Sequence, residues 1–369
     1  MANIGYLQVV RHCNHYCGFC SNPSTPFEHT LESMRLLVDD LCARGYFGVV
    51  LTGGEPSLHP ELPAITRYAK GRGLHVRMIT NGHRMAQPEF AQAVADAGLD
   101  LVHVSIYSVR PEVERRLRGA EGTLGLALAA VENAHRAGVE VNVNCVINRH
   151  NADHLDENVE YLIEHHPYVR HYVWNNLDPS MGRAEVNQAE FVPTLRSFEA
   201  SLHRALGLLY RSGRTFRVER VPLCYMTDFA WASTETRKIV KAEERVVHFL
   251  DEKQTIRQTD WEHQYAEVCS VCSLRPICGG LFDRGAAYDP AELAPVFASP
   301  DPIVRAILGD ADDRPTAAAV SAPAVGLVTA DSLRRHARRR EVETRRAATL
   351  GLEPERSSRG PGADPEGIE

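Results

Sequence analysis

Short apolar runs alternate with amphipathic stretches over about the first 180 residues of the chain. The apolar runs are rich in β-branched residues and predict strands at residues 6–10, 48–52, 75–80, 101–107, 139–147 and 170–174. The stretches between them predict helices at residues 31–44, 61–70, 88–97, 124–137 and 152–165. Several of these helices end beside a glycine, as in CARGYF, AGLDL and RAGVEV, which is typical of a helix C-terminus.

This regular alternation of strand and helix favours an α/β fold with a parallel sheet and crossover helices. Six such units suit an open, partial (β/α)6 TIM-like barrel better than a closed barrel of eight units. A further helix is predicted at residues 189–211, and we therefore assign residues 1–215 to one core domain.

The pattern changes twice after this core. Residues 216–300 include polar stretches and four cysteines, which predicts a small C-terminal auxiliary domain stabilised partly by a metal. Residues 301–369 are rich in Ala, Pro, Asp and Arg, a composition typical of a largely disordered tail. Within this tail, the basic segment 333–346 is either a solvated, partly helical stretch or a docking arm for an acidic partner.

The chain has 369 residues, and 44% of them are hydrophobic, which is enough to bury a full core. Its formal net charge of -7 gives no general reason to expect nucleic acid or an anionic membrane as a partner. The first residues lack the features of a secretory signal, and no run of about 18 apolar residues predicts a membrane-spanning helix. We therefore expect a soluble, cytoplasmic protein, whose clustered cysteines more often bind metal than form disulfides.

Three of the nine cysteines lie within the eight residues CNHYCGFC, as Cys13, Cys17 and Cys20. Thiolates are soft ligands that suit zinc or iron–sulfur clusters. Structural zinc usually takes four protein ligands, so three cysteines in one loop fit a four-iron cluster that has one iron left open for a substrate or cofactor. A zinc or redox site remains the alternative for this loop taken alone.

Other polar motifs follow the predicted strands in order. In VVLTGGEP, Gly53 and Gly54 allow the backbone to approach a ligand closely, and Glu55 and Pro56 complete the motif. Further candidates at later strand ends are Asn81 in MITNG, Ser105 in VHVSIYS, Asn144 in NVNCVIN, and Asn175 and Asn176 in VWNNLDP. Barrel active sites form at such strand ends, although each of these residues alone is commonly a structural polar residue.

The Cys-x3-Cys-x2-Cys spacing, with Phe19 before the last cysteine and GGEP after the second predicted strand, resembles the radical S-adenosylmethionine superfamily. The resemblance covers about residues 5–180. It implies that Cys13, Cys17 and Cys20 hold a 4Fe–4S cluster whose open iron binds the methionine group of S-adenosylmethionine. One-electron cleavage then gives a 5′-deoxyadenosyl radical that abstracts a hydrogen atom from the substrate, so that the cofactor carries the difficult chemistry.

The same resemblance implies the roles of the other motifs. The GGEP residues would bind the methionine amino group, and Phe19, Asn81, Ser105 and Asn144 would be further cofactor contacts. Asn175 and Asn176 could line the adenosine or the substrate. A reductant such as flavodoxin or ferredoxin would supply the electron.

The second cysteine cluster is Cys224 with Cys269-x2-Cys272-x5-Cys278. Four thiolates can close a zinc site or a fully ligated iron–sulfur cluster, and the spacing does not separate the two. In this position the cluster resembles a SPASM or twitch-type extension, and the small number of cysteines points to one auxiliary 4Fe–4S cluster with an electron-transfer role. A metal that only stabilises the fold is the alternative. We expect Cys145 and Cys42 to be packing residues, although Cys145 could also act as a reactive thiol.

Fold does not set the substrate, since this superfamily hosts many reactions. By family analogy we expect a peptide or protein residue to be modified, with a small-molecule natural-product precursor as the alternative. The first predicted strand begins near Met1, so we expect no leader-binding domain ahead of it, and a peptide would need a separate carrier or a leaderless mode. A different class, a non-catalytic iron–sulfur electron carrier or zinc-stabilised binding protein, would not need the GGEP and TNG motifs.

Overall fold

The computed structural model describes residues 4–22, 24–242, 245–248, 256–258, 264–282 and 286–309. The basic segment 333–346 that we predicted in the tail lies outside the described residues. Within the described residues there are nine strands: β1 Ile4–Val10, β2 Gly48–Gly53, β3 His75–Thr80, β4 Leu101–Ser105, β5 Glu140–Ile147, β6 His171–Asn176, β7 Thr215–Glu219, β8 Arg245–His248 and β9 Ile256–Gln258. The six predicted strands correspond to β1–β6.

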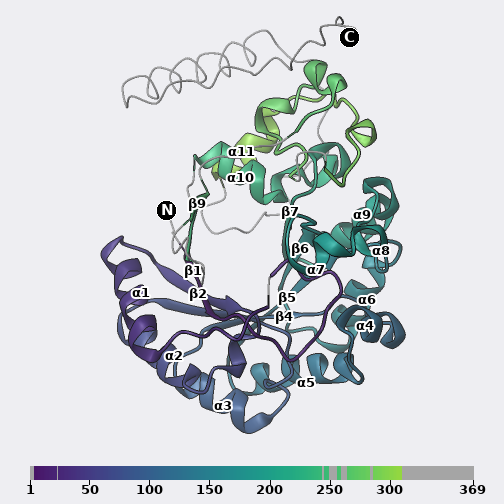
Figure 1. The fold of residues 1–369 in the computed structure, drawn as a ribbon. Helices are drawn as coiled ribbons and strands as arrows, with labels where there is room; N and C mark the ends of the chain where they lie inside the picture. Colours follow the sequence, from purple (N-terminus) through teal and green to yellow (C-terminus); the bar gives the residue numbers. More distant parts are fainter. Residues whose placement is uncertain are drawn as a thin grey trace, which may run out of the picture.

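All nine strands belong to one sheet with the order β7-β6-β5-β4-β3-β2-β1-β8-β9 (Figure 1). Strands β1 to β7 run parallel in chain order, β8 pairs parallel with β1, and β9 pairs antiparallel with β8. The sheet has two edges, at β7 and β9, so the predicted partial barrel is confirmed. The sequence pattern missed β7, which adds a seventh strand next to β6, and it missed β8 and β9 at the opposite edge.

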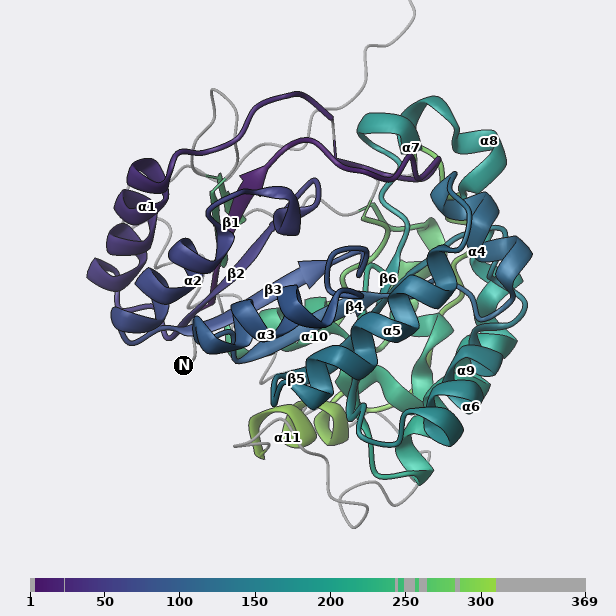
Figure 2. The same cartoon turned by 90° about the horizontal axis from the view of Figure 1, so that it is seen from below.

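The helices of the described residues are α1 Leu31–Ala43, α2 Leu62–Gly71, α3 Pro88–Asp96, α4 Pro111–Arg118, α5 Thr123–Arg136, α6 Leu155–His165, α7 Gly182–Val186, α8 Gln188–Phe191, α9 Leu195–Arg211, α10 Thr234–Lys241 and α11 Asp301–Gly309. Helices α1 to α6 and α9 cover one face of this sheet, as Figure 2 shows from below, whereas α10 and α11 lie above the sheet in Figure 1. Short 3-10 helices lie at Pro56–Leu58, Leu223–Tyr225, Thr227–Ala232, Glu267–Val271, Arg275–Ile277 and Pro290–Glu292.

Burial alternates along the strands because one sheet face packs against these helices. In β3, Val76, Met78 and Thr80 are buried. The residues that alternate with them, His75, Arg77 and Ile79, are only partly buried. The buried side chains join the main hydrophobic core. The other face, which we call the inner face, carries many polar residues.

Helix α4 was not predicted, since it has few apolar residues in PEVERRLR. Its other signals are present in the chain. A proline stands at its first turn, Glu112 and Glu114 lie near its N-terminus, and Gly119 ends it in the left-handed conformation with φ 62°. Among the predicted glycine endings, Gly98 and Gly138 have φ of 98° and 79°, as expected.

The described residues after β7, other than those of β8 and β9, form a lobe that lies above the sheet in Figure 1. The hydroxyl of Tyr288 donates to the carbonyl of Leu177 at 2.7 Å and to Asn176 Oδ1 at 3.1 Å. The Glu292 carboxylate accepts from the backbone N–H groups of Leu195 and Arg196 at the start of α9, a favourable place for a negative charge. These contacts join the lobe to the barrel.

The predicted domain boundaries stay predictions, but two elements bear on them. The boundary between residues 215 and 216 falls inside β7, which pairs with β6 over five positions and so extends the barrel sheet. Residues 301–309, which we assigned to the tail, form α11, where Asp301 and Pro302 favour a helix start and Ile307 is buried.

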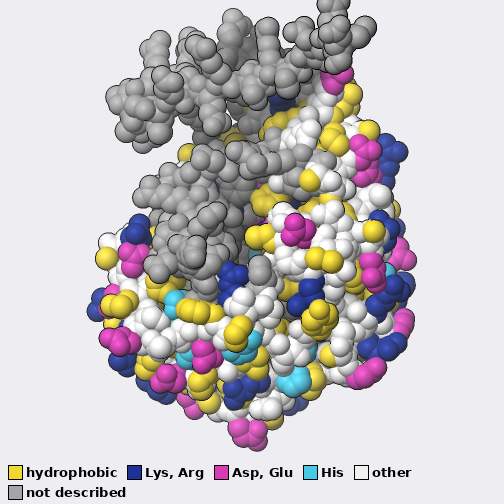
Figure 3. All heavy atoms as spheres, viewed as in Figure 1, with side chains coloured by type: hydrophobic (Ala, Val, Ile, Leu, Met, Phe, Trp, Pro, Cys, Tyr) yellow, Lys and Arg dark blue, Asp and Glu magenta, His cyan; other side chains and the backbone are white. Residues whose placement is uncertain are grey.

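The visible surface in Figure 3 carries acidic and basic side chains interspersed, without a large area of one sign. Among the described residues, no helix combines the length and the apolar character that crossing a bilayer requires.

Candidate functional site

The three clustered cysteines lie on the loop that follows β1, and the end of β2 packs directly against this loop. The backbone N–H of Gly54 donates to the carbonyl of Val10 at 2.6 Å, and that of Glu55 donates to the carbonyl of His12 at 2.9 Å. The CxxxCxxC loop and the GGEP motif are therefore joined backbone to backbone.

This close contact explains both glycines of GGEP. A Cβ atom on Gly53 would lie 2.1 Å from the carbonyl oxygen of Val10, and one on Gly54 would lie 1.9 Å from that of His12. Gly53 also has a φ of 134°, which other residues rarely adopt. The predicted close approach is present, but in the structure it is made to the chain's own backbone and not to a ligand.

Glu55 connects the second motif to the third. Its buried carboxylate accepts from the Thr80 hydroxyl and from the backbone N–H of Asn81, both at 2.6 Å, and from the Ser57 N–H at 3.1 Å. Asn81 continues the chain of contacts, since its amide donates to Asn14 Oδ1 at 2.8 Å and lies 3.7 Å from Cys13 Sγ. The CxxxCxxC, GGEP and TNG motifs thus form one hydrogen-bonded unit.

A buried ion pair, not predicted from the sequence, lies beneath this unit. Arg118 and Glu114 on α4 are fully buried, and Arg118 Nε donates to Glu114 Oε1 at 2.6 Å. The guanidinium also donates to the carbonyls of Asn81 and Ser105. The second oxygen of Glu114 accepts from two backbone N–H groups after β4. The pair therefore ties the ends of β3 and β4 to α4.

The outer side of the cysteine loop is held by α7 and α8. Arg183 Nε donates to the carbonyl of Cys17 at 2.8 Å, and Asn187 donates to the carbonyl of Gly18 at 3.0 Å. The ring of Phe19 is buried between Tyr107 and Phe191, with ring centroids 4.8 Å and 6.1 Å away. Phe19 is therefore a hydrophobic anchor of the loop, and its predicted contact with a cofactor stays a prediction.

Burial raises the pKa of two of the loop thiols. It raises the pKa of Cys13, and it raises the pKa of Cys17 to about 12, although the Arg118 charge opposes the shift. The neighbouring cysteines add to these rises, Cys20 for the pKa of Cys13, and Cys20 and Cys13 for the pKa of Cys17. Loading a metal at these cysteines must therefore displace their protons.

The remaining predicted cofactor contacts lie near these motifs. Pro56 is buried and begins a 3-10 helix that Glu55 caps. Ser105 is buried at the end of β4, and its carbonyl accepts from Arg118. On the inner face, the Asn175 amide donates to Asn144 Oδ1 at 2.7 Å.

Three further residues singled out in the sequence have structural surroundings. Asn176 is buried and donates to the carbonyl of Arg220 at 3.3 Å, in addition to its contact with Tyr288, so it joins the barrel to the lobe. Cys145 is 2% exposed in the core, as expected for a packing residue, and burial raises its pKa. Cys42 is half-buried on α1.

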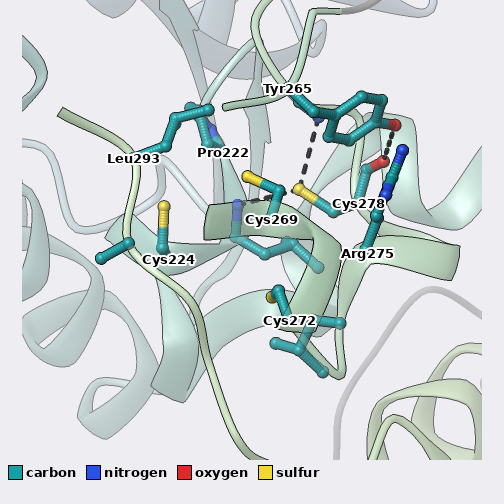
Figure 4. Close-up of a pocket in the computed structure, with 12 residues that line it drawn as sticks. Pro222, Cys224, Tyr265, Cys269, Cys272, Arg275, Cys278 and Leu293 are labelled. Carbon is teal, nitrogen blue, oxygen red and sulfur yellow. Dashed lines mark hydrogen bonds between the residues drawn. The ribbon is translucent and has the colours of Figure 1, made fainter. Parts of the chain in front are cut away.

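The four distal cysteines line one pocket in the lobe (Figure 4). Cys224, Cys269 and Cys278 surround the same space in the figure, and Cys272 lies below them. They come from three 3-10 helices and their ends, with apolar walls from Pro222, Leu223, Leu274 and Leu293.

Backbone N–H groups point at two of these sulfurs. Cys278 Sγ accepts from Gly280 at 3.3 Å and from Leu223 at 3.5 Å, and Cys272 Sγ accepts from Val296 at 3.3 Å. Hydrogen bonds to sulfur are one of the means by which proteins set the reduction potentials of iron–sulfur clusters. Burial raises the pKa of Cys224 to about 12 and that of Cys278 to about 11.

The donor chemistry fits two thiolate-bound groups. All nine cysteines are free thiols, and seven of them fall into the two sets described above. Within the part of the chain that the structure describes, no three His, Cys, Asp or Glu side chains form a ready single-metal site. The first set offers three thiols from one loop, and the second offers four around a pocket.

Comparison with known proteins shows what the part of the chain that carries this site is similar to. Residues 7–162 match the sequence model of the Radical SAM superfamily. Its members use a 4Fe–4S cluster and S-adenosylmethionine. The resemblance deduced from the motifs is thus confirmed.

The curated relatives have different activities. The chain is 30% identical over 168 residues to a PqqA peptide cyclase of Ruegeria pomeroyi, which covers 44% of this chain and 45% of the relative. It is 34% identical over 145 residues to a probable GTP 3′,8-cyclase of Thermococcus kodakarensis, which covers 38% of this chain and 46% of the relative. The chain therefore matches less than half the length of each.

Solved structures extend the likeness to more of the chain. The structure titled native anSMEcpe with bound AdoMet has a TM-score of 0.58 and 14% identity, and the match covers 80% of this chain and 93% of that one. SuiB of Streptococcus suis has a TM-score of 0.50 and 12% identity, covering 59% of this chain and 49% of that one. At these identities the likeness shows the fold alone.

Proposed function

We propose that the protein is a radical S-adenosylmethionine enzyme that abstracts a hydrogen atom from a peptide or protein residue. The observation that carries this proposal is the hydrogen-bonded unit of three motifs, in which Gly54 and Glu55 bind the cysteine loop and Glu55 holds Asn81 beside Cys13. A non-catalytic electron carrier or zinc protein would not require GGEP and TNG to be built onto the thiol loop.

Cys13, Cys17 and Cys20 would hold the 4Fe–4S cluster, and when bound the cluster and S-adenosylmethionine supply one-electron cleavage chemistry. The chain's own residues position and shield this site. Arg118 adds a buried positive charge close to Cys17, which favours an anionic group there. Phe19, Tyr107 and Phe191 form an apolar wall behind the loop and exclude water on that side.

The four distal cysteines would hold one auxiliary 4Fe–4S cluster. The pocket that they line, its apolar walls and the N–H groups directed at Cys272 and Cys278 support this assignment. Because all four thiols would be used as ligands, its role would be electron transfer and not substrate binding.

Two findings support a peptide substrate. One is the PqqA peptide cyclase similarity, and the other is the structure titled native anSMEcpe with bound AdoMet and Kp18Cys peptide, which matches 79% of this chain with a TM-score of 0.57. The similarity to a probable GTP cyclase supports the alternative of a small-molecule substrate, at 34% identity over a comparable length.

Anaerobic reconstitution tests the proposal. We expect about eight irons per chain, as two 4Fe–4S clusters require, and 5′-deoxyadenosine after addition of dithionite and S-adenosylmethionine. A colourless, zinc-loaded protein would contradict the proposal. So would an intact iron–sulfur protein that forms no 5′-deoxyadenosine with any peptide or nucleotide substrate offered.

Replacing Cys224, Cys269, Cys272 and Cys278 together with Ala should lower the iron content by about four per chain. The first cluster should remain, because its loop is anchored by α7, α8 and GGEP and not by the lobe. Iron and sulfide counts, with the electron paramagnetic resonance spectrum of the reduced protein, measure this. Loss of zinc with unchanged iron would assign the pocket to structural zinc instead.

A further inference from the structure

The inner face of the barrel carries a polar group that the proposed cofactor site does not use. Arg77 in β3, His103 in β4 and Asn142 in β5 lie on this face, and Arg77 pairs in register with Leu101, two positions before His103. His103 and Asn142 are register partners on neighbouring strands. Two positions further along β5, Asn144 lies on the same face and pairs with Asn175. The three residues, which we call the inner-face triad, therefore lie deeper along the strands than Asn144 and Asn175.

The triad is short of hydrogen-bond partners. Asn142 is 3% exposed, and its Oδ1 has no partner within the described residues. Arg77 uses only Nε, which donates to His75 Nδ1 at 3.2 Å, and within the part of the chain described its terminal nitrogens have no hydrogen bond. A buried polar atom without a hydrogen-bond partner destabilises a native protein, so the Asn142 oxygen is a candidate to accept a hydrogen bond from a ligand.

The electrostatics of the triad link its members. Burial and, to a smaller extent, the charge of Arg77 lower the pKa of His103 to about 4, and the charge of Glu219 opposes the shift. The imidazole is therefore neutral at pH 7, and the positive charge that acts on it is that of Arg77. A neutral imidazole beside a guanidinium accepts or donates one hydrogen bond without adding charge.

We propose that Arg77, His103 and Asn142 bind the end of a peptide substrate, with Arg77 taking the terminal carboxylate and Asn142 Oδ1 taking the N–H of the last residue. A guanidinium binds a carboxylate through paired hydrogen bonds. A carboxylate has no hydrogen to donate to Asn142 Oδ1, so the donor for this oxygen is the backbone N–H of the last peptide residue. His103 lies between the two and bonds to the remaining carboxylate oxygen.

This inference rests on the proposed function for the assumption that the substrate is a peptide. It adds that the C-terminal end of the peptide is the end that enters the barrel. A peptide C-terminus and a free amino acid both have a carboxylate beside an N–H donor. The site distinguishes the two sources, because a free amino acid brings an ammonium group close to the Arg77 charge.

Saturation-transfer NMR on the reconstituted protein, without S-adenosylmethionine, tests the inference with N-acetylglycine as the probe. We expect N-acetylglycine to bind. N-acetylglycinamide, which lacks the carboxylate, and glycine, which has an ammonium group, should each bind about tenfold or more weakly than N-acetylglycine. Arg77→Gln should weaken the binding of N-acetylglycine by a similar factor. Asn142→Leu should weaken the binding of N-acetylglycine but leave the binding of acetate unchanged. Arg67→Gln is the matched control, because Arg67 is exposed on α2 and its replacement removes the same charge away from the triad.

Equal binding of N-acetylglycine and its amide, or unchanged binding in Arg77→Gln, would overturn the inference. Equal binding of glycine would overturn the assignment to a peptide end. Iron content and the unfolding transition of each variant show whether it is folded. Because 5′-deoxyadenosine formation is measured separately, an enzyme that cleaves S-adenosylmethionine without binding N-acetylglycine would contradict this inference alone.

Discussion

Replacing Cys13, Cys17 and Cys20 together with Ala should abolish formation of 5′-deoxyadenosine and leave about four irons per chain in place of about eight. The three thiols are the only cysteine ligands that the loop offers, so their removal leaves no soft ligand for the cluster there. Product analysis by chromatography, with iron and sulfide counts, measures both effects.

The fold should survive this change. The loop is held by backbone contacts to Val10 and His12 and by the Phe19 ring, none of which involves a thiol. The far-ultraviolet circular dichroism spectrum should therefore match the wild-type spectrum. Cys42→Ala is the matched control, because it removes a half-buried thiol from α1 without touching the loop. Persistent cleavage of S-adenosylmethionine by the triple variant would show that the core assignment is wrong.

Arg118→Met should lower the free energy of unfolding by about 3–5 kcal/mol, because it leaves the Glu114 carboxylate buried and unpaired. It should also lower 5′-deoxyadenosine formation strongly, since the carbonyls of Asn81 and Ser105 lose their shared donor. Chemical denaturation and product analysis measure the two effects.

The double variant Glu114→Gln with Arg118→Met separates stability from positioning. It should recover much of the lost stability, because no buried charge remains and the glutamine oxygen still accepts from the N–H groups of Tyr107 and Ser108. It should not recover the activity. If the single variant lost less than about 1 kcal/mol, the pair would not be the buried support described above.

The sequence pattern predicted the barrel well because each strand from β1 to β6 is a distinct apolar run beside an amphipathic helix. It missed β7, where TFRVE has only two apolar residues, and β8 and β9, whose pairing with β1 joins segments far apart in the chain. Such pairing depends on where the lobe returns to the sheet, which a local pattern does not contain.

The site was predicted where motifs are contiguous and missed where residues act from a distance. Cys13, Gly54 and Glu55 are recognisable because their motifs follow strands. Arg118 was missed because a single arginine in the charged run ERRLR gives no signal of complete burial. Arg183 and Asn187 were missed because they act on the loop from more than 160 positions away. For Glu114 and Arg118, the i, i+4 spacing was the one available signal.

The hydrogen bonds that hold the cysteine loop bear on the order in which the protein folds and takes up iron. Because Gly54, Glu55, Arg183 and Asn187 hold the loop backbone, its conformational entropy is lost when the chain folds and not when iron arrives. The distal cysteines stand on short 3-10 helices, where less regular structure orders the ligands. Maturation should thus proceed in two stages, with a barrel that folds first and receives its cluster afterwards, and a lobe whose final packing awaits its metal.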